Sequence, residues 1–446
     1  MGIFREYDVR GLYPSEVSEQ IAYNIGRALV VYLGAKEIVV ARDCRLGSPS
    51  MAKAVIEGIC DQGASVIDVG LASTPLFYFC IGFLKPEGGI MVTASHCPKE
   101  FNGFKICKQG PVSLSLGLGF PEIQKMVDGG IFPQPISKGT IKEIDMLNKY
   151  ADHVLTFAKD IKPLKVVIDA GNGMGGLVCP EVLSKLPVIS VPIWFDLDGS
   201  FPNRNPNPMI LENLKTVCDR VKKEKADLGV IFDGDADRII FIDERGEFIP
   251  GDFTTALIAE YLSSQKKHLT VLYDLRSSRI LKEHLQSLGI SSFRTMVGHS
   301  HVKSAMRKYD ADFAGELSGH FYFKENYFSD SSMIAFAMIL SILSRTGKSL
   351  SSLIKPFRKY YSTFEVNFSV MSIEGVLKEI KKVFKDGKQD ELDGITVEYP
   401  DWWFNVRPSK NDPVLRMVLE AYSGELLKEK RAQVERVIQK FVVPAC

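Results

Sequence analysis

The sequence predicts an α/β protein: three similar α/β domains with mixed sheets around a central cleft, plus a smaller C-terminal α+β domain. One pattern occurs three times, namely an apolar strand ending at an acidic residue, a polar or Gly-rich turn, a helix and another strand. Each copy is followed by a further strand that ends in a polar loop. The chain has 446 residues, too many for one core of ordinary size. Several domains facing one cleft are therefore expected.

The three copies begin at strands with the same kind of end. The first strand, EIVVARD, ends at Asp43, and the others, LKVVIDA and LTVLYD, carry Asp169 and Asp274. In the first copy Pro49 suits the first turn of a helix. The apolar positions that follow have the spacing of one helix face: Ala52, Val55, Ile56 and Ile59. Alternation of strands and helices of this kind predicts parallel or mixed sheets covered by helices.

Proline-rich and polar stretches mark the expected domain limits. They are IFPQPISKG, ERGEFIPGD and the segment around KPFRKYYSTFEV. After the last one the pattern does not return, and two alternating runs, FEVNFSV and ITVEYP, indicate a different α+β unit. The predicted domains are 1–135, 136–245, 246–361 and 362–446.

Charge and composition exclude several classes of partner. The chain has 55 Lys and Arg against 54 Asp and Glu, so no broad basic surface for nucleic acid or membrane is expected. No segment reaches the roughly 18 apolar residues of a membrane span, and the start, MGIFREYDVRG, lacks the apolar core of a signal peptide. The eight cysteines are scattered without metal-ligand spacing and are expected to be reduced thiols. We therefore predict a cytoplasmic protein.

The loop DGDADR carries the strongest chemical signal. Asp233, Asp235 and Asp237 follow the apolar strand LGVIF at alternate positions. Three like charges so close repel one another, so a hard cation with oxygen ligands is expected, and Mg²⁺ is the ion predicted. A haloacid-dehalogenase-like phosphatase, with Asp233 as nucleophile, is an alternative. That motif normally opens its domain and ends in Gly-Thr, where this chain has Ala236 and Asp237.

The turn GNGMGG, residues 171–176, fits the G-x-G-x-x-G fingerprint of dinucleotide-binding proteins. Asp196 or Asp198 lies at about the distance expected for a ribose-binding acid. An NAD-dependent enzyme is therefore an alternative from another class. We favour a tight turn that lets the following helix pack close to the sheet, because the other loops point to phosphoryl chemistry.

The loop TASHCP places Ser95 after the strand GGIMV, with Lys105 shortly beyond it. An unactivated serine is a poor nucleophile, so a catalytic role requires a metal or a base nearby. Lys105 could neutralise a phosphate or exchange a proton.

Two further loops have groups suited to a sugar phosphate. In GELSGH, Glu316, Ser318 and His320 occupy alternate positions, which on an extended segment puts all three on one face, as a polyol would require. VGHSHVK supplies His299 and Lys303 shortly before it. VRPSKNDP forms a Pro-bounded loop whose polar residues could grip a phosphate: Arg407, Ser409, Lys410 and Asn411.

The loops TASHCP, DGDADR, GELSGH and VRPSKNDP follow one another in this order along the chain. In this they resemble the α-D-phosphohexomutase family and within it the phosphomannomutase/phosphoglucomutase group. The resemblance covers essentially the whole chain. It begins at FREYDVRG, where Tyr7 and Arg10 match the N-terminal motif, and ends at VRPSKNDPVLR. Each motif alone is weak, but all of them in order are specific.

The resemblance implies an intramolecular phosphotransferase. It would interconvert hexose 1-phosphate and hexose 6-phosphate of mannose and/or glucose, through a phosphoserine and a 1,6-bisphosphate intermediate. Its partners would be small-molecule sugar phosphates, with Mg²⁺ as cofactor and glucose or mannose 1,6-bisphosphate as activator. A phosphoglucosamine mutase is the alternative within the family. A monomer or homodimer is expected.

The resemblance also implies a role for each matching residue. Ser95 would be the phosphoserine and would share the metal with Asp233, Asp235 and Asp237. The other catalytic residues would be Lys105, Arg10, His299 and Arg238. The substrate would be bound by Tyr7, Arg276, Glu316, Ser318, His320, Arg407, Ser409, Lys410 and Asn411.

The sequence departs from the family pattern in two loops. The serine loop commonly reads TASHNP, so Cys97 stands in place of Asn. The phosphate loop commonly has Asn-Thr or Gly-Thr after its serine, where this chain has Lys410 and Asn411. The reaction class follows from the remaining residues, whereas the preferred sugar does not.

Overall fold

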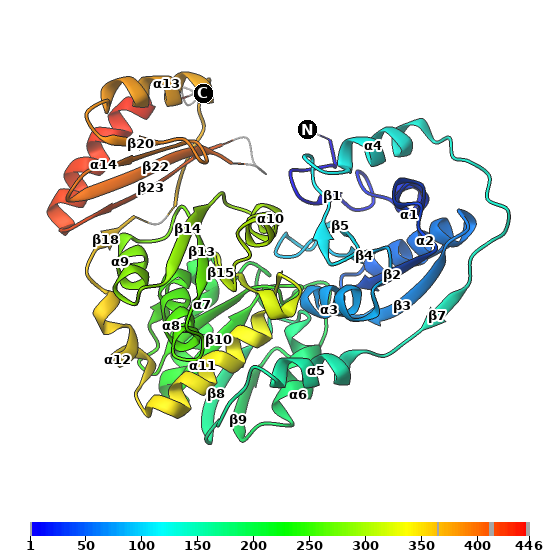
Figure 1. The fold of residues 1–446 in the computed structure, drawn as a ribbon, viewed down its shortest axis with the longest axis horizontal. Coiled ribbons are helices and arrows are strands. Elements are labelled where there is room, and N and C mark those ends of the chain that lie inside the picture. Colours follow the sequence, from blue (N-terminus) through cyan, green and yellow to red (C-terminus); the bar gives the residue numbers. More distant parts are fainter. Residues whose placement is uncertain (1, 364, 410–413, 443–446) are drawn as a thin grey trace.

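The computed structural model describes residues 2–363, 365–409 and 414–442, and it folds into four sheets along the chain. The first three sheets are mixed and covered by helices, whereas the fourth pairs its strands antiparallel. Figure 1 shows the first domain (blue) and the last (orange to red) at opposite ends, with the second and third between them. The predicted fold class is confirmed.

The first sheet has the strand order β1-β5-β4-β2-β3-β7, with β6 paired to β5. Its strands are β1 (Val9–Leu12), β2 (Glu37–Arg42), β3 (Ser65–Leu71), β4 (Gly88–Val92), β5 (Phe101–Lys108), β6 (Val112–Ser113) and β7 (Ile141–Glu143). Its helices are α1 (Glu19–Leu33), α2 (Ser48–Asp61), α3 (Thr74–Leu84) and α4 (Phe120–Gly129). The helix expected after Asp43 is α2. β7 follows residue 135 in the chain and still pairs with β3.

The second sheet has the order β12-β11-β10-β8-β9. Its strands are β8 (Leu164–Asp169), β9 (Val188–Ile193), β10 (Leu228–Phe232), β11 (Ile239–Asp243) and β12 (Phe248–Ile249), and its helices are α5 (Leu147–Leu155), α6 (Gly175–Leu183) and α7 (Leu211–Glu224). Strands β8, β9 and β10 are parallel, and β11 turns back antiparallel to β10.

The third sheet has the order β14-β13-β15-β16-β17. Its strands are β13 (Thr270–Asp274), β14 (Ser291–Thr295), β15 (Phe313–Gly315), β16 (Phe321–Phe323) and β17 (Ser329–Asp330). The helices are α8 (Gly251–Ser263), α9 (Arg279–Ser287), α10 (His299–Tyr309), η1 (Lys324–Asn326), α11 (Ser332–Thr346), α12 (Leu350–Ile354) and η2 (Lys355–Phe357).

The fourth sheet has the order β18-β23-β22-β21-β20, with β19 also paired to β23. Its strands are β18 (Tyr361–Ser362), β19 (Val366–Phe368), β20 (Lys388–Asp390), β21 (Ile395–Glu398), β22 (Trp402–Pro408) and β23 (Leu415–Ala421), with helices α13 (Ile373–Val383) and α14 (Gly424–Gln439).

The same four-strand arrangement recurs in the first three sheets. The orders β3-β2-β4-β5, β9-β8-β10-β11 and β14-β13-β15-β16 correspond strand by strand. In each, the last connection joins a parallel strand to an antiparallel one. The serine loop, the metal loop DGDADR and the sugar loop GELSGH are therefore the same connection in three copies of one unit.

One hydrophobic core joins the first three domains. It includes Phe77 from α3, Phe232 from β10 and Phe336 from α11. The last domain has a core of its own, built around Phe404 and Leu419. The first three loops are thus carried by one packed body.

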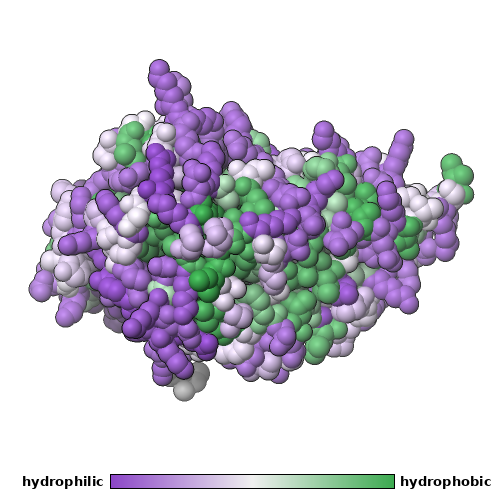
Figure 2. Space-filling model, turned by 90° about the horizontal axis from the view of Figure 1, so that it is seen from below, coloured by the Kyte–Doolittle hydropathy of each residue, from purple (hydrophilic) through white to green (hydrophobic). Residues whose placement is uncertain are grey.

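No single helix in the described part of the chain is both long and apolar enough to cross a membrane. The bent helix pair Ser332–Thr346 and Leu350–Phe357 has the length and composition of a membrane span. However, its first helix, α11, is buried in the core. Figure 2 shows one face of the molecule, where apolar residues gather in the middle among polar ones. Exposed apolar side chains are common on folded proteins. The cysteines in the described residues are free thiols, as expected.

Candidate active site

A cleft of about 1640 Å³ lies between the four domains. Every domain contributes to its wall, as shown by Arg10, Asn205, Ser318 and Arg416. Because the strand ends of the first three sheets meet here, the loops that follow them face a common space. The central cleft predicted from the sequence is present.

The serine loop, residues 93–100, is held in a strained conformation. Ser95 has a φ of +52°, a value that non-glycine residues seldom adopt. Its backbone N–H donates to Thr93 Oγ1 over 2.9 Å. The side chain is buried, and its Oγ lies 3.2 Å from Asp233 Oδ2 and 3.2 Å from His96 Nδ1. The hydroxyl is therefore fixed beside the metal loop.

Arg45 holds this loop from behind, and the sequence analysis missed it. Its guanidinium is fully buried and lies 3.3 Å from Asp43. It donates four hydrogen bonds of 2.6–3.0 Å to backbone carbonyls, those of Ser95, Cys97, Pro98 and Phe101. A planar fork with several donors suits this task, whereas a lysine could not reach all four acceptors.

Three buried carboxylates, Asp233, Asp235 and Asp237, cluster in the metal loop, with ligand atoms within 4.8 Å of one another. Asp233 Oδ1 accepts from the backbone N–H groups of Asp237 and Arg238. Burial, together with the charges of Asp237 and Asp235, raises the pKa of Asp233 well above its ordinary range. The three groups ionise together only if positive charge is close.

Lys105 supplies part of that charge. Its ammonium lies 2.6 Å from Asp235 Oδ2 and also contacts Asp237 Oδ2. Although burial favours the neutral amine, the two carboxylates raise the pKa of Lys105 above its ordinary value. Lys105 is thus a cation in this site.

The donor set fits a divalent cation. The Oδ1 atoms of Asp235 and Asp237 are buried and have no hydrogen-bond partner among the described residues. One ammonium leaves the carboxylates with excess negative charge, and Ser95 Oγ lies at the edge of the group. Hard oxygen ligands of this kind suit Mg²⁺.

The sugar loop differs from the expected geometry. Residues 316–320 form a tight turn between β15 and β16, so the predicted extended segment with Glu316, Ser318 and His320 on one face is wrong. The reason is that the strands pair antiparallel immediately on both sides, and Glu316 N–H donates to the His320 carbonyl across the turn. All three side chains still line the cleft.

The turn sends its two outer side chains to different partners. Glu316 accepts from the Gly298 N–H over 3.0 Å and from the Tyr322 hydroxyl over 2.6 Å. His320 Nε2 accepts from Arg238 Nε over 3.0 Å, which joins the sugar loop to the metal loop.

His299 and Tyr7 lie together on the cleft wall, with ring centroids 5.3 Å apart. Neither ring nitrogen of His299 has a hydrogen-bond partner in the described part of the chain. Burial and the charges of Lys303 and Lys105 lower the pKa of His299 well below its ordinary value. This imidazole is therefore neutral at pH 7.

Cys97, which stands where the family pattern has Asn, makes a structural contact with Arg10. Arg10 Nη1 donates to Cys97 Sγ over 3.1 Å, and its Nε lies 3.5 Å from Asp8. The thiol thus takes part in orienting Arg10 at the entrance of the serine loop.

Two arginines predicted to bind substrate meet at Glu365, which the sequence analysis also missed. Arg276 forms a bidentate pair with Asp274, at 3.1 and 2.7 Å, and lies 3.8 Å from Glu365. Arg407 donates to the same Glu365 carboxylate. Ser409 is buried beyond Arg407. Lys410 and Asn411 lie outside the described residues.

The glycines of GNGMGG make room for the metal loop. A Cβ on Gly173 would come within 2.6 Å of the Gly234 carbonyl oxygen, and one on Gly176 within 2.0 Å of the Phe195 carbonyl oxygen. Met174 N–H also donates to the Gly234 carbonyl. These glycines allow neighbouring backbone to approach closely, which supports the tight-turn interpretation over the dinucleotide site.

Comparison with known families matches three successive parts of the chain. Residues 1–117, 148–246 and 250–360 match the phosphoglucomutase/phosphomannomutase alpha/beta/alpha domains I, II and III. A phosphomannomutase from Methanocaldococcus jannaschii is 36% identical over 98% of both chains.

Solved structures agree with this. A phosphoglucomutase/phosphomannomutase family protein from Burkholderia thailandensis is 31% identical, with a TM-score of 0.91 over 98% of this chain and 97% of its own. N-acetylphosphoglucosamine mutase from Aspergillus fumigatus, solved with glucose 1,6-bisphosphate, shares the fold at 14% identity, with a TM-score of 0.65 over 99% and 96% of the two chains.

Proposed function

The chain belongs to the phosphoglucomutase/phosphomannomutase family and is a hexose phosphate mutase, and from that premise we propose its substrates and mechanism. It interconverts the 1- and 6-phosphates of mannose and/or glucose through phosphorylated Ser95 and a 1,6-bisphosphate. The observation that carries this is the 3.2 Å separation of Ser95 Oγ from Asp233, with Lys105 on the neighbouring carboxylates.

Phosphoryl transfer depends mainly on alignment and on stabilising charge at the phosphoryl oxygens. Asp233, Asp235, Asp237 and a phosphoserine oxygen would hold Mg²⁺, which when bound neutralises this charge. Lys105 and Arg238 add two further cations on the protein side. The strained backbone at Ser95 keeps the carrier oxygen at the metal loop.

In the first transfer the bond between phosphorus and Ser95 Oγ breaks and a bond to a sugar hydroxyl oxygen forms. The proton of that hydroxyl passes to a base, for which neutral His299 is suited. Protonated Lys105 gives a proton to Ser95 Oγ as that oxygen leaves, and takes it back when Ser95 accepts the second phosphate, while protonated His299 returns its proton to the sugar oxygen. Arg10 stays charged and neutralises phosphate charge. The bisphosphate turns within the cleft between the two steps.

The remaining polar residues suit the two ends of the substrate. Glu316 and Ser318 would bind sugar hydroxyls, with Tyr7 and Arg276 beside them. His320 lines the same part of the cleft, and its ring nitrogens face Arg238 and Asp330, so it would border the sugar with its ring edge. Arg407, Ser409, Lys410 and Asn411 would hold the phosphate that does not react. We propose glucose or mannose 1,6-bisphosphate as the activator, and the glucose 1,6-bisphosphate bound by the Aspergillus fumigatus protein supports the first of these.

Cellular setting and assembly stay predictions. These are a cytoplasmic monomer or homodimer that acts on small-molecule sugar phosphates and binds neither nucleic acid nor membrane. The limits of the four domains likewise remain as proposed from the sequence.

The test is phosphate occupancy of Ser95. After incubation with glucose 1,6-bisphosphate and Mg²⁺, mass spectrometry should find phosphate on Ser95, and Ser95→Ala should lose both phosphate and turnover. Ser263→Ala is the matched control, because its hydroxyl bonds only to the helix carbonyl of Glu260 in the described structure. Mutase activity in the Ser95→Ala protein would refute the carrier role.

The sugar is assigned by comparing rates on mannose 1-phosphate, glucose 1-phosphate and glucosamine 1-phosphate. Similar rates on the first two would support a dual-specificity enzyme. A strong preference for glucosamine 1-phosphate would instead establish the alternative substrate.

A further inference from the structure

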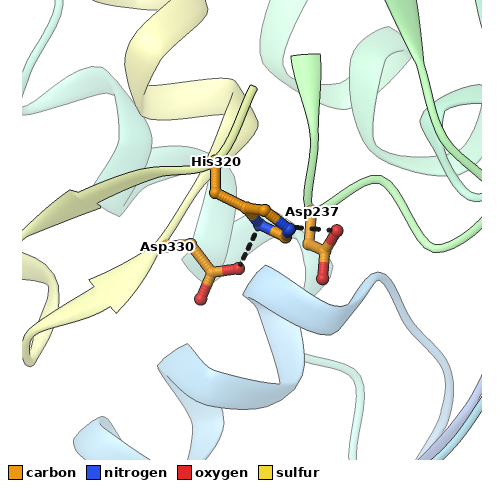
Figure 3. A group of neighbouring side chains, drawn as sticks. All are labelled: Asp237, His320 and Asp330. Carbon is orange, nitrogen blue, oxygen red and sulfur yellow. Dashed lines mark hydrogen bonds and ion pairs between the residues drawn. The ribbon is translucent and has the colours of Figure 1, made fainter. Parts of the chain in front are cut away.

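A buried group of polar side chains, two of them an ion pair, lies behind the metal loop. It consists of Asp330 from β17, Lys303 from α10 and His320 from the sugar loop, which are 1%, 1% and 5% exposed. Figure 3 shows His320 pointing between Asp330 and Asp237. The mechanism proposed above uses neither Asp330 nor Lys303.

The hydrogen bonds of His320 define where its ring proton lies. Arg238 Nε carries a hydrogen and can only donate, so His320 Nε2, 3.0 Å away, must accept and carries no proton. The neutral ring then has its proton on Nδ1. Asp330 Oδ2 lies 3.2 Å from Nδ1, within hydrogen-bond distance, whereas Asp237 Oδ1 is 3.7 Å away.

Lys303 fixes the other side of Asp330. Its ammonium lies 2.9 Å from Asp330 Oδ1 and 3.3 Å from the centroid of the Tyr78 ring. A buried carboxylate is costly unless it is paired, and this ion pair compensates its charge. Since Tyr78 belongs to α3, the group also connects the third domain to the first.

The same three residues of Figure 3 have the spacing of a metal site, since their ligand atoms lie within 4.8 Å of one another. Protein cations already contact two of them. Arg238 engages His320 Nε2, and Lys303 engages Asp330. A relay of donors and acceptors accounts for these contacts better than a second ion.

We propose that Asp330, held by Lys303, is a positioning residue that fixes the Nδ1–H form of His320, so that Nε2 holds Arg238 beside Asp233. The inference rests on the role proposed above for Arg238, that of a cation which stabilises charge at the phosphoryl oxygens. Arg238 Nε lies 3.8 Å from Asp233 Oδ2, and its side chain lines the cleft. A mispositioned guanidinium would reduce the stabilisation of the transition state more than it would reduce the affinity for the substrate.

The ring proton can be observed directly by ¹⁵N NMR of the full chain labelled at histidine, at about pH 8, above the ordinary histidine titration range. His320→Gln assigns the signals. We expect a protonated Nδ1 and an unprotonated Nε2. A protonated Nε2, or a doubly protonated ring, would overturn the proposal. This readout does not require catalysis, so it stands whether or not Ser95 carries phosphate.

Asp330→Asn tests the relay, because an amide has one acceptor and one donor face. If the amide oxygen stays on Lys303, the amide NH₂ group faces the Nδ1–H of His320, and two donors meet. The ring then shifts to the form that carries its proton on Nε2. We expect kcat to fall about 10- to 100-fold, with a smaller change in KM and loss of the Nδ1–H signal. Asp312→Asn, which removes the ion pair between Asp312 and Lys266 in the same domain, should leave kcat and the Nδ1–H signal unchanged.

The double variant Asp330→Asn with Lys303→Met separates positioning from general damage. Without the ammonium, the amide oxygen is free to accept from Nδ1–H, so both the signal and much of the kcat should return. An Asp330→Asn protein that keeps the Nδ1–H signal and full kcat would refute the relay. So would a titration with Mg²⁺ or Zn²⁺ that finds two bound ions, one of which Asp330→Asn removes.

Discussion

The first three domains and the fourth are attached to the cleft in different ways. The serine, metal and sugar loops rise from three sheets that share one hydrophobic core. The fourth domain has a separate core and meets the third through polar contacts. Arg279 donates from its side chain to the carbonyls of Tyr399, Pro400 and Trp402, and from its backbone to Glu420.

This difference separates two requirements of the proposed reaction. The reacting oxygen, the metal ligands and the cations must keep sub-ångström alignment, which a shared packed core provides. The phosphate that does not react must be gripped and released, which polar contacts between separate cores permit. Variants in the first group should therefore change kcat, whereas variants in the second should change KM.

The largest effect is expected from Asp235→Asn. The variant removes a charge from the metal loop while keeping an oxygen for Thr74, whose hydroxyl donates to Asp235 over 2.6 Å. We expect kcat to fall about 10³-fold and to recover only in part at high Mg²⁺. Steady-state rates over a Mg²⁺ titration measure this. Asp219→Asn on exposed α7 is the control, and an equal loss there would contradict the assignment.

The next effect is expected from Arg45→Lys, which keeps the charge and removes the fork that holds the serine loop. We expect a fall in kcat of about 10²-fold with little change in KM, because the loop that carries Ser95 loosens. Arg42→Lys is a matched control, since Arg42 bonds to a single carbonyl nearby. Wild-type kcat in Arg45→Lys would show that the four bonds do not position Ser95.

At the junction with the fourth domain, stability should depend on pH through Asp252. Burial, with a further contribution from Glu420, raises its pKa to about 7, against about 3.9 when unfolded. Between these values the folded protein keeps a proton that the unfolded chain has lost. This contribution to stability is therefore present at low pH and is lost as pH rises towards 7.

From pH 5 to pH 7 the loss should amount to about 2 kcal/mol in the free energy of unfolding. Urea unfolding at several pH values measures it, and Asp252→Asn should flatten the difference. A wild-type stability that rises over this interval, with the variant unchanged, would contradict the prediction.

The smallest effect is expected from Arg279→Lys, which weakens the docking of the fourth domain. We expect KM for the sugar phosphate to rise about fivefold with kcat nearly unchanged, a loss of about 1 kcal/mol in binding. Initial rates at varied substrate give both constants. A fall in kcat with constant KM would mean that the fourth domain also aligns the reacting groups.

The repeated fold and the strand-end loops could be predicted because their signals are contiguous. Asp233, Asp235 and Asp237 follow one apolar strand, and the same strand-turn-helix order returns three times. The turn at 316–320 was misjudged because alternation of polar residues looks the same in a strand and in a short turn whose ends pair.

Arg45, Glu365 and Asp330 were missed for another reason. The carbonyls that Arg45 holds and the Arg407 side chain that bonds to Glu365 lie 42 or more residues away, and carbonyls leave no mark on residue type. Asp330 lies only ten residues from His320, but the sequence does not show that the two side chains face each other. Only the packed structure brings such groups together.

The equivalence of the three loops makes activity a reporter of assembly. Each copy of the unit carries one of the three loops, to which we assign the carrier serine, the metal ligands and the sugar-binding turn. A chain cut between any two copies would separate side chains that, in the proposed reaction, must act within a few ångströms of one another. Turnover recovered from a mixture of such fragments would measure how completely the domains reassemble.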